Sequence, residues 1–195
     1  MLRALIPGRA FAFPKSLYAV FDTIRFVVAN KPNALILDFF SGSGTTLHAV
    51  NLLNVEDAGH RRCIMVTNNE VSVEEAKQLA AQGFQPGDEE WERLGIAHYV
   101  TLPRTICSIE GHDINGQPLK GNYELDHPLS MADGFKTNAA FFKLGFLDKN
   151  AVAIGRQFKE LLSTLWMKAG AHGPCPVIED GVPDMLILPE NRMPS

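Results

Sequence analysis

The sequence predicts an α/β fold, in which short buried strands alternate with helices around a parallel sheet. Two continuous apolar runs, 34–37 and 63–66, are each followed by a loop and then by a helical pattern. Apolar runs of this length are typical of strands that are buried on both faces. The composition agrees, because 46% of the 195 residues are apolar, enough to bury a core.

The first part of the chain, residues 1–103, is expected to form two strand–loop–helix units and a third strand. Ser16 and Ser72 each precede a one-face apolar pattern, in the position of a helix N-cap. The expected elements are, in order, a helix over 17–29, a strand over 34–37, a helix over 45–53, a strand over 63–66, a helix over 73–82 and a strand over 96–102. Together they predict part of a doubly wound sheet.

The pattern changes after Pro103, and residues 104–195 are expected to form an α+β extension. A turn-forming segment, 115–118, separates two β-like stretches and indicates a hairpin. The expected elements are hairpin strands over 105–109 and 123–125, a strand over 141–147, an amphipathic helix between Asn150 and Gly170, and a last strand over 185–188.

Charge argues against an autonomous nucleic-acid binder, since the formal net charge is −4. Residues 1–50 nevertheless hold five Lys and Arg against two Asp and Glu, whereas residues 51–100 hold four against nine. We therefore expect any contact with a polyanion near the N-terminal end. We expect these basic side chains to be mainly solvated.

Cysteine and histidine spacing excludes two common kinds of site. Cys63, Cys107 and Cys175 form no CxxC pair, and the six histidines form no HxxxH pair, so neither a disulfide framework nor a metal centre is predicted. No apolar stretch is long enough for a membrane span. These features predict a cytoplasmic protein with buried thiols.

The most informative segment is 38–46, with the sequence DFFSGSGTT, at the end of the first apolar run. Its glycines let backbone approach a ligand closely, and the start of the following helix offers N–H groups to an anion. Asp38 is suited to a cationic amine, so a zwitterionic amino acid fits this loop. The Walker loop requires a lysine where Thr45 stands, and the dinucleotide fingerprint requires a third glycine where Leu47 stands.

This segment resembles the methionine-pocket motif DPFxGSGTT of amino-group DNA methyltransferases, with Phe39 in place of the usual proline. Segment 11–16 (FAFPKS) looks like the motif that precedes it in the permuted, β-class order, and 66–70 (VTNNE) matches the end of the second strand. Segments 132–136 (ADGFK) and 165–170 (LWMKAG) resemble the C-terminal extension of adenine-specific enzymes akin to Type III modification subunits.

The resemblance implies a partial Rossmann-like, S-adenosylmethionine-dependent methyltransferase sheet, with residues 1–103 as the cofactor-binding half and 104–195 as the extension. It also implies a methionine pocket formed by Asp38, Phe40, Gly42, Gly44 and Thr45. The segment that closes this pocket would be Pro14, Lys15 and Ser16, and the polar groups near the ribose would be those of Thr67 and Asn68. Family members often keep a carboxylate after the second strand, where this chain has Glu70 slightly later.

No catalytic residue is predicted in this chain. The family holds its flipped target base with an Asp/Asn/Ser-Pro-Pro-aromatic tetrapeptide, and no Pro-Pro occurs here. The nearest string, Asp126-His127-Pro128-Leu129, has one proline and no aromatic. His48 is expected to be a packing or surface residue rather than a base. In the permuted order the tetrapeptide precedes residue 1, so the chain looks like the C-terminal portion of a longer or split enzyme.

The function implied is the S-adenosylmethionine-binding portion of a DNA adenine-N6 methyltransferase of a restriction-modification system, inactive alone. Its implied partners are DNA and either an upstream methyltransferase half or a restriction subunit. Two alternatives stay open: a cytosine-N4 methyltransferase, which uses the same pocket, and a non-catalytic cofactor-binding or interaction remnant. An upstream reading frame with a Pro-Pro-aromatic tetrapeptide would favour an enzyme over a remnant.

Overall fold

The computed structural model describes the chain except for residues 10, 146–147, 151–157, 171–174 and 178–195. Contacts divide the chain into two compact units, Met1–Phe141 and Phe142–Ser195. Residues 104–141 therefore belong to the same compact unit as the first 103. The boundary expected at residue 103 does not coincide with this division, and the assignment of functions to the two sides of it stays a prediction.

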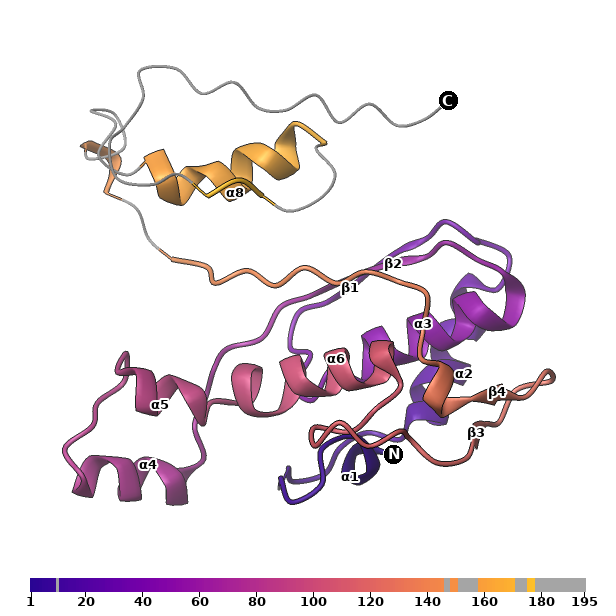
Figure 1. Cartoon of the computed structure of the whole chain (residues 1–195). Helices are drawn as coiled ribbons and strands as arrows, with labels where there is room; N and C mark the ends of the chain where they lie inside the picture. Colours follow the sequence, from indigo (N-terminus) through magenta and orange to yellow (C-terminus); the bar gives the residue numbers. More distant parts are fainter. Residues whose placement is uncertain (10, 146–147, 151–157, 171–174, 178–195) are drawn as a thin grey trace. The chain divides into compact units, whose positions relative to one another are not determined.

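The first unit is a mixed α/β structure built around a small parallel sheet (Figure 1). Strand β1 (Leu35–Asp38) pairs with β2 (Arg62–Met65), with Leu35 opposite Arg62 and Asp38 opposite Met65. Helix α3 (Thr45–Asp57) connects the two strands. Both predicted strands are confirmed within one residue at each end, and the predicted helix extends four residues further.

Helix α2 (Leu17–Val28) packs on α3 and forms the larger core. It begins where predicted, because the Ser16 hydroxyl accepts a hydrogen bond from Ala19 N at 3.5 Å. Its apolar spacing puts one stripe against α3, and the two helices exclude water between them. The buried residues of this core are Leu17, Phe21, Val28, Ala49, Leu52, Leu53, Tyr123 and Phe135.

A second core joins the N-terminus to a helical segment in the middle of the chain. Helix α1 (Leu2–Leu5), which was not predicted, packs against α6 (Leu102–Glu110), and one turn of π-helix, η1 (Ala97–Thr101), leads directly into α6. The buried residues of this core are Leu2, Leu5, Ile6, Val100, Cys107 and Leu119. Cys107 is thus a buried thiol, as expected.

Two predicted strands, 96–102 and 105–109, are wrong, because both segments are helical. Pro103 stands in the first turn of α6, where a missing N–H costs no helical hydrogen bond. The buried face of α6 is largely polar, since Arg104, Thr105 and Ser108 are buried there together with Cys107. Thr101, the last residue of η1, lies on the same side, at steps of three and four from Arg104 and Thr105.

The predicted hairpin is also formed differently. Its turn exists, since Asp113 Oδ1 accepts from Asn115 N at 2.8 Å and from Gln117 N at 3.0 Å. The paired strands, however, are β3 (Asn122–Tyr123) and β4 (Leu129–Ser130), which run antiparallel further along the chain. A short 3₁₀ turn, η2 (Met131–Asp133), follows them.

Two further helices follow β2. Helix α4 (Val73–Ala81) begins at Ser72, whose hydroxyl accepts from Glu75 N at 3.3 Å, so the predicted cap and helix are confirmed. Helix α5 (Glu89–Arg93) has no buried residue, and its Trp91 is half-buried.

The second unit contains α8 (Phe158–Lys168), in which Leu162 and Trp166 are buried. Its described part agrees with the amphipathic helix predicted before Gly170. Residues 141–145 form no strand, so the described part of that prediction is wrong, and the strand predicted over 185–188 lies outside the described residues. None of the helices described is both long and apolar enough to span a bilayer.

Candidate functional site

The loop between β1 and α3 is fastened to the carboxyl end of both strands. Val66 N donates to Asp38 O at 2.8 Å, and Ser41 N donates to Val66 O at 3.1 Å, which extends the pairing beyond the strands. Gly44 N donates to Ser41 O at 2.9 Å and closes the turn. Open α/β sheets bind their ligands at this edge. The loop therefore lies at the carboxyl end of a strand in a parallel sheet, as the sequence predicted.

Both glycines of the loop adopt backbone conformations that other residues rarely take. Gly42 has φ +49° and Gly44 has φ +75°. A Cβ at Gly44 would stand 3.1 Å from Thr101 Cγ2 and 3.6 Å from Met65 Cε. Gly44 is thus required both by its dihedral angle and by the space around it. The Thr101 hydroxyl also donates to the carbonyl oxygen of Gly42, so η1 supports the loop from behind.

Asp38 is oriented by the first turn of α3. The Thr46 hydroxyl donates to Asp38 Oδ2 at 2.5 Å, which fixes the carboxylate at the end of β1. The side chain is half-buried. A carboxylate held in this way at the mouth of a loop is suited to receive an ammonium group.

Arg104 is the largest fully buried side chain described and lies directly behind the loop. Its Nη1 donates to Thr45 Oγ1 at 2.7 Å, to Ser43 Oγ at 3.0 Å and to Ser43 O at 3.3 Å. The hydroxyl of Thr45, a predicted cofactor-binding residue, thus faces Arg104. Ser43 Oγ lies 3.2 Å from Thr45 Oγ1, so one hydroxyl donates to the other.

The charge of Arg104 is not neutralised by a neighbouring acid. Within the described part of the chain it forms no salt bridge, and its Nε has no hydrogen-bond partner. Burial lowers the pKa of Arg104 to about 10, so the guanidinium remains cationic at neutral pH. The start of α3 therefore has two sources of positive potential: its own N–H groups and a buried cation.

His48 is a packing residue, as predicted. It is 2% exposed, its Nε2 lies 2.9 Å from the Tyr123 hydroxyl, and its ring meets those of Tyr123 and Phe135 edge to face at 5.5 Å. Burial, followed by the nearby charge of Arg104, lowers the pKa of His48 to about 3. The imidazole is therefore neutral across the physiological range and supports the helix rather than acting as a base.

In the segment after β2, Asn69 makes structural hydrogen bonds, whereas Asn68 and Glu70 are exposed. Asn69 Nδ2 donates to Glu92 O at 2.8 Å, and Asn69 Oδ1 accepts from Ala97 N at 3.0 Å. Asn68 is exposed, and its Nδ2 lies 3.4 Å from Glu70 Oε2. Asn68 and Glu70 thus form an exposed polar pair at the edge of the sheet.

A cavity of about 320 Å³ lies beside this segment and is lined largely by apolar side chains. Phe11 joins it to the glycine loop, since a Cβ at Gly42 would stand 3.8 Å from Phe11 Cζ. The other lining residues that matter here are Glu70, Ser72, Ile96, Tyr99 and Val100. The cavity and the loop share one edge of the sheet.

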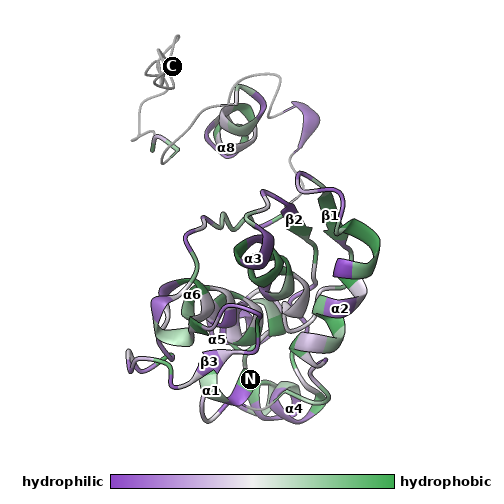
Figure 2. Ribbon diagram, turned by 90° about the vertical axis from the view of Figure 1, so that its right-hand side faces the viewer, coloured by the Kyte–Doolittle hydropathy of each residue, from purple (hydrophilic) through white to green (hydrophobic). Residues whose placement is uncertain are grey.

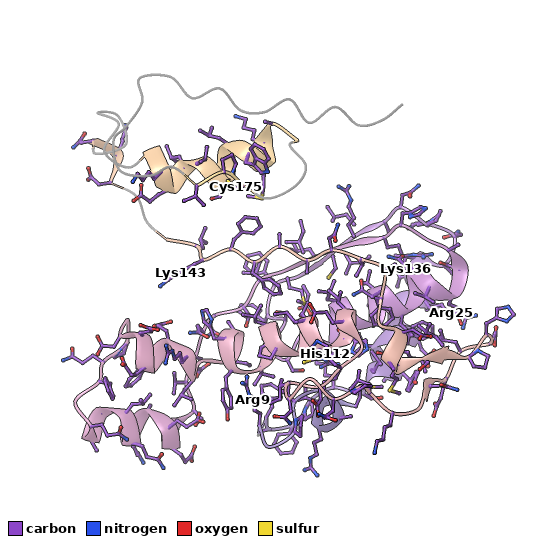
Figure 3. All side chains as sticks on the ribbon, in the orientation of Figure 1. Arg9, Arg25, His112, Lys136, Lys143 and Cys175 are labelled. Atoms are coloured by element: carbon purple, nitrogen blue, oxygen red, sulfur yellow. The ribbon has the colours of Figure 1, made fainter. Side chains whose placement is uncertain are left out.

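The N-terminal segment approaches the glycine loop through Phe11, and the role predicted for Pro14, Lys15 and Ser16 stays a prediction. Pro14, Lys15 and Ser16 are exposed, and the Ser16 hydroxyl is engaged as the N-cap of α2. Phe11, from the same segment, is the residue that approaches the loop. Arg9, labelled in Figure 3, donates to Tyr99 O at 2.6 Å and lies over the Tyr99 ring, so it is not simply solvated as expected.

One face of the small sheet is apolar and exposed. Leu35, Leu37 and Ile64 are each at least half exposed, although they belong to paired strands. Figure 2 shows hydrophobic colouring on these strands. Phe39 and Phe40 extend this surface with exposures of 61% and 86%, and their rings meet edge to face. Parallel sheets normally have both faces covered. Phe40, a predicted pocket residue, thus lies on the open side of the loop.

Sequence reasoning missed Arg104, Thr101 and Phe11 as parts of this site. Arg104 lay between two segments assigned to strands, 96–102 and 105–109, and its contacts with the loop span about 60 residues of sequence. The available signal was the helical spacing of polar residues after position 100. No group of three or more His, Cys, Asp or Glu in the described residues lies close enough to hold a metal ion.

The site thus combines a glycine loop, an oriented carboxylate and a helix start with positive potential. Such a set can hold an ammonium beside Asp38 and an anion over the first turn of α3. The adjoining apolar cavity adds room for a larger, partly apolar group. These features favour a ligand that has a zwitterionic end joined to a ring.

Comparison with known proteins finds similarity to methyltransferases of restriction-modification systems. The chain is 46% identical over 62 residues to the Type II methyltransferase M.KpnI of Klebsiella pneumoniae, an alignment that includes 32% of this chain and 14% of that protein. It is 34% identical over 84 residues to the Type III restriction-modification enzyme EcoPI Mod subunit of Escherichia phage P1, including 43% of this chain and 12% of the relative.

The StyLTI Mod subunit of Salmonella typhimurium aligns over more of the chain, with 29% identity over 198 aligned positions that include 86% of this chain and 28% of the relative. No protein-family model matches the sequence. No solved structure matches it either. The chain spans between about an eighth and about a quarter of the length of these relatives. It is therefore related to the methyltransferases of restriction-modification systems.

Proposed function

We propose that this chain is the S-adenosylmethionine-binding portion of a DNA methyltransferase that acts on adenine N6 within a restriction-modification system. Residues 1–103 are the cofactor-binding half, arranged in the permuted, β-class order on part of a Rossmann-like sheet. Residues 104–195 are the extension, whose first part supports the glycine loop. The relationship to a Type II methyltransferase and two Mod subunits supports this reaction class.

The observation that carries the proposal is the charge arrangement around the loop. S-Adenosylmethionine ends in an amino acid, with an ammonium and a carboxylate on the same carbon. Asp38 is oriented to receive the ammonium, and the start of α3 suits the carboxylate. The glycines at 42 and 44 leave room for the chain that joins them to the sulfonium. The bound cofactor would supply an electrophilic methyl group.

The nucleoside end fits the remaining predicted residues. Thr67 and Asn68 follow β2, and an exposed carboxylate, Glu70, lies beside Asn68. Either the amide or the carboxylate can bond ribose hydroxyls. The neighbouring cavity, which Phe11 and Tyr99 help to line, suits the adenine ring. Pro14, Lys15 and Ser16 would close this pocket, by the resemblance of their motif.

The exposed sheet face supports an additional protein segment in the complete enzyme. A two-stranded parallel sheet is marginal by itself, and its apolar face is uncovered here. Further strands and helices, on a preceding segment or on another subunit, would cover that face and carry the base-holding tetrapeptide. DNA would then be bound by the complete enzyme rather than by this acidic chain alone.

Isothermal titration of the whole chain tests the cofactor assignment. We expect saturable binding of S-adenosylmethionine and of its demethylated product, S-adenosylhomocysteine, and no detectable binding of NADH or ATP. The reason is that the loop lacks both the Walker lysine and the third dinucleotide glycine. Binding of NADH as tight as that of S-adenosylhomocysteine would contradict the assignment.

A tritium-transfer assay tests the reaction. The chain alone should transfer no methyl group from labelled cofactor to duplex DNA, because nothing in it holds the flipped base in line with the donor. A segment that carries the tetrapeptide and completes the sheet should restore transfer, and Asp38→Ala should remove the restored activity. Robust transfer by this chain alone would show that the catalytic residues have been misplaced.

A further inference from the structure

Two side chains of opposite charge fasten the first turn of α3. Thr45 Oγ1 accepts a hydrogen bond from Arg104 at 2.7 Å, whereas the next residue, Thr46, donates its hydroxyl to Asp38 at 2.5 Å. Asp38 ends β1 and Arg104 belongs to α6. The helix start is thus held between an acid and a base from two different elements.

The position of Arg104 is electrostatically unfavourable unless an anion is bound. The N-terminal end of a helix has a positive potential, so a buried cation there is repelled by the helix. Arg104 is 1% exposed, and within the described residues no carboxylate pairs with it and its Nε has no partner. Buried charges in proteins are ordinarily paired. The structure of the protein alone thus leaves this charge uncompensated.

We infer that Arg104 is a positioning residue that prepares the start of α3 for the carboxylate of the cofactor's amino-acid end. It does so by holding the Ser43 and Thr45 hydroxyls from behind and by adding its positive charge to that of the helix. The inference rests on the proposed function, since it requires a ligand with a zwitterionic end at this loop.

Arg104 acts through the loop rather than by touching the ligand. The Nη1 that faces the loop is already bonded to Ser43 and Thr45. Ser43, which accepts two of these bonds, is 4% exposed, so the groups bonded to the guanidinium are themselves buried. The charge therefore contributes through space, in a buried region where screening by water and salt is weak.

The test compares two ligands that differ in the amino-acid end. S-Adenosylhomocysteine has the ammonium and the carboxylate, whereas 5′-methylthioadenosine has the same nucleoside and sulfur without them. Titration calorimetry of the full chain gives the ratio of the two affinities. An effect on the carboxylate changes this ratio, whereas general damage to the fold lowers both affinities together.

In Arg104→Gln, which keeps an N–H donor but removes the charge, we expect the affinity for S-adenosylhomocysteine to fall on the order of tenfold. The affinity for 5′-methylthioadenosine should stay within about twofold. Arg104→Lys, which keeps the charge, should have a ratio of the two affinities close to that of the wild-type chain. Arg93→Gln, at an exposed arginine of α5, is the matched control and should change neither affinity.

Each outcome decides a different claim. Equal losses for both ligands, or no loss in a folded Arg104→Gln variant, would overturn the role of Arg104 and leave the proposed function standing. Absence of S-adenosylhomocysteine binding by the wild-type chain would overturn the proposed function and this inference with it. If Arg104→Gln does not fold, Ser43→Ala serves instead, and a loss confined to S-adenosylhomocysteine is again the expected result.

Discussion

Helix α3 has a buried arginine at each end, and the two differ in what surrounds their charge. Near the last residue of the helix, Arg61 bonds both carboxylate oxygens of Asp57 at 2.8 Å and donates to the carbonyl oxygens of Val28 and Ala29. Near the first residue, Arg104 bonds hydroxyls and a carbonyl, and no acid of the described residues pairs with it.

The difference separates a structural arginine, Arg61, from Arg104, which we propose prepares a ligand site. A cation at the C-terminal end of a helix is favourable, and Arg61 also satisfies carbonyls that end α2. A cation at the N-terminal end is unfavourable and is tolerated where an anion binds. The two ends of α3 should therefore respond differently to substitution: the Arg61 end in stability, and the glycine-loop end in ligand binding.

The largest effect is expected at the ligand end. Gly44→Val should reduce S-adenosylhomocysteine binding by at least 100-fold, because a Cβ there would stand 3.1 Å from Thr101 Cγ2 and the residue has φ +75°. Calorimetry measures the loss. Gly116→Val is the matched control, since Gly116 has φ +77° and open space around it. Normal binding by a folded Gly44→Val variant would remove this loop as the ligand site.

At the other end, Arg61→Ala should lower the free energy of unfolding by about 3 kcal/mol, because it removes the ion pair of the buried Arg61 with Asp57 and the side-chain donor to the carbonyl oxygens of Val28 and Ala29. Urea denaturation measures the change, with the exposed neighbour Arg62→Ala as control. The ratio of S-adenosylhomocysteine to 5′-methylthioadenosine affinity should stay unchanged. A fall in that affinity ratio would contradict the claim that Arg61 affects stability rather than ligand binding.

Between the two ends, His48 should make stability depend on pH. Its pKa is about 3 in the folded chain against 6.5 when exposed, so the unfolded state binds more protons between these values. Stability should therefore be unaffected above pH 6.5 and fall as the pH drops below it, by up to about 1.4 kcal/mol per unit. Urea denaturation of wild type and His48→Gln at several pH values measures this, and parallel pH profiles would contradict it.

The smallest effect is expected away from α3. Arg93→Ala removes an exposed ion pair with Glu89 in α5, whose side chains are 70% and 74% exposed. Pairs of this kind contribute about 0.5 kcal/mol or less to the free energy of unfolding. Denaturation midpoints should barely move, and ligand binding should not change. A loss above about 1 kcal/mol would mean that α5 has a stabilising role its exposed surface does not explain.

The elements with clear hydrophobic periods were predictable from the sequence. Helix α2, strand β1, the glycine loop and strand β2 lie where the apolar runs and the Ser16 cap indicated. In α2, local propensity and tertiary burial favour the same structure. Strands β1 and β2 form where predicted, but one face of their sheet is exposed rather than buried. The predicted cofactor residues around this loop remain predictions, but their backbone setting follows directly from the strand–loop–helix pattern.

The segment after residue 96 was not predictable in the same way. Val100 and Thr101 are β-branched and favour strands locally, yet they lie in helical structure because tertiary contacts decide. Arg104, which completes the loop, is buried by hydrogen bonds to Ser43 and Thr45, whereas a charged residue is ordinarily expected at the surface. Its role depends on contacts between distant parts of the chain, which periodicity alone does not reveal.

The central claim is that S-adenosylmethionine binds at the loop between β1 and α3. A ¹⁵N-labelled sample of the chain, titrated with S-adenosylhomocysteine and followed by NMR, reports this residue by residue. We expect the amide signals of Gly42, Gly44 and Thr46 to shift and saturate together, while those of α5 stay in place. Shifts confined to other parts of the chain, or no shifts at saturating ligand, would contradict the account.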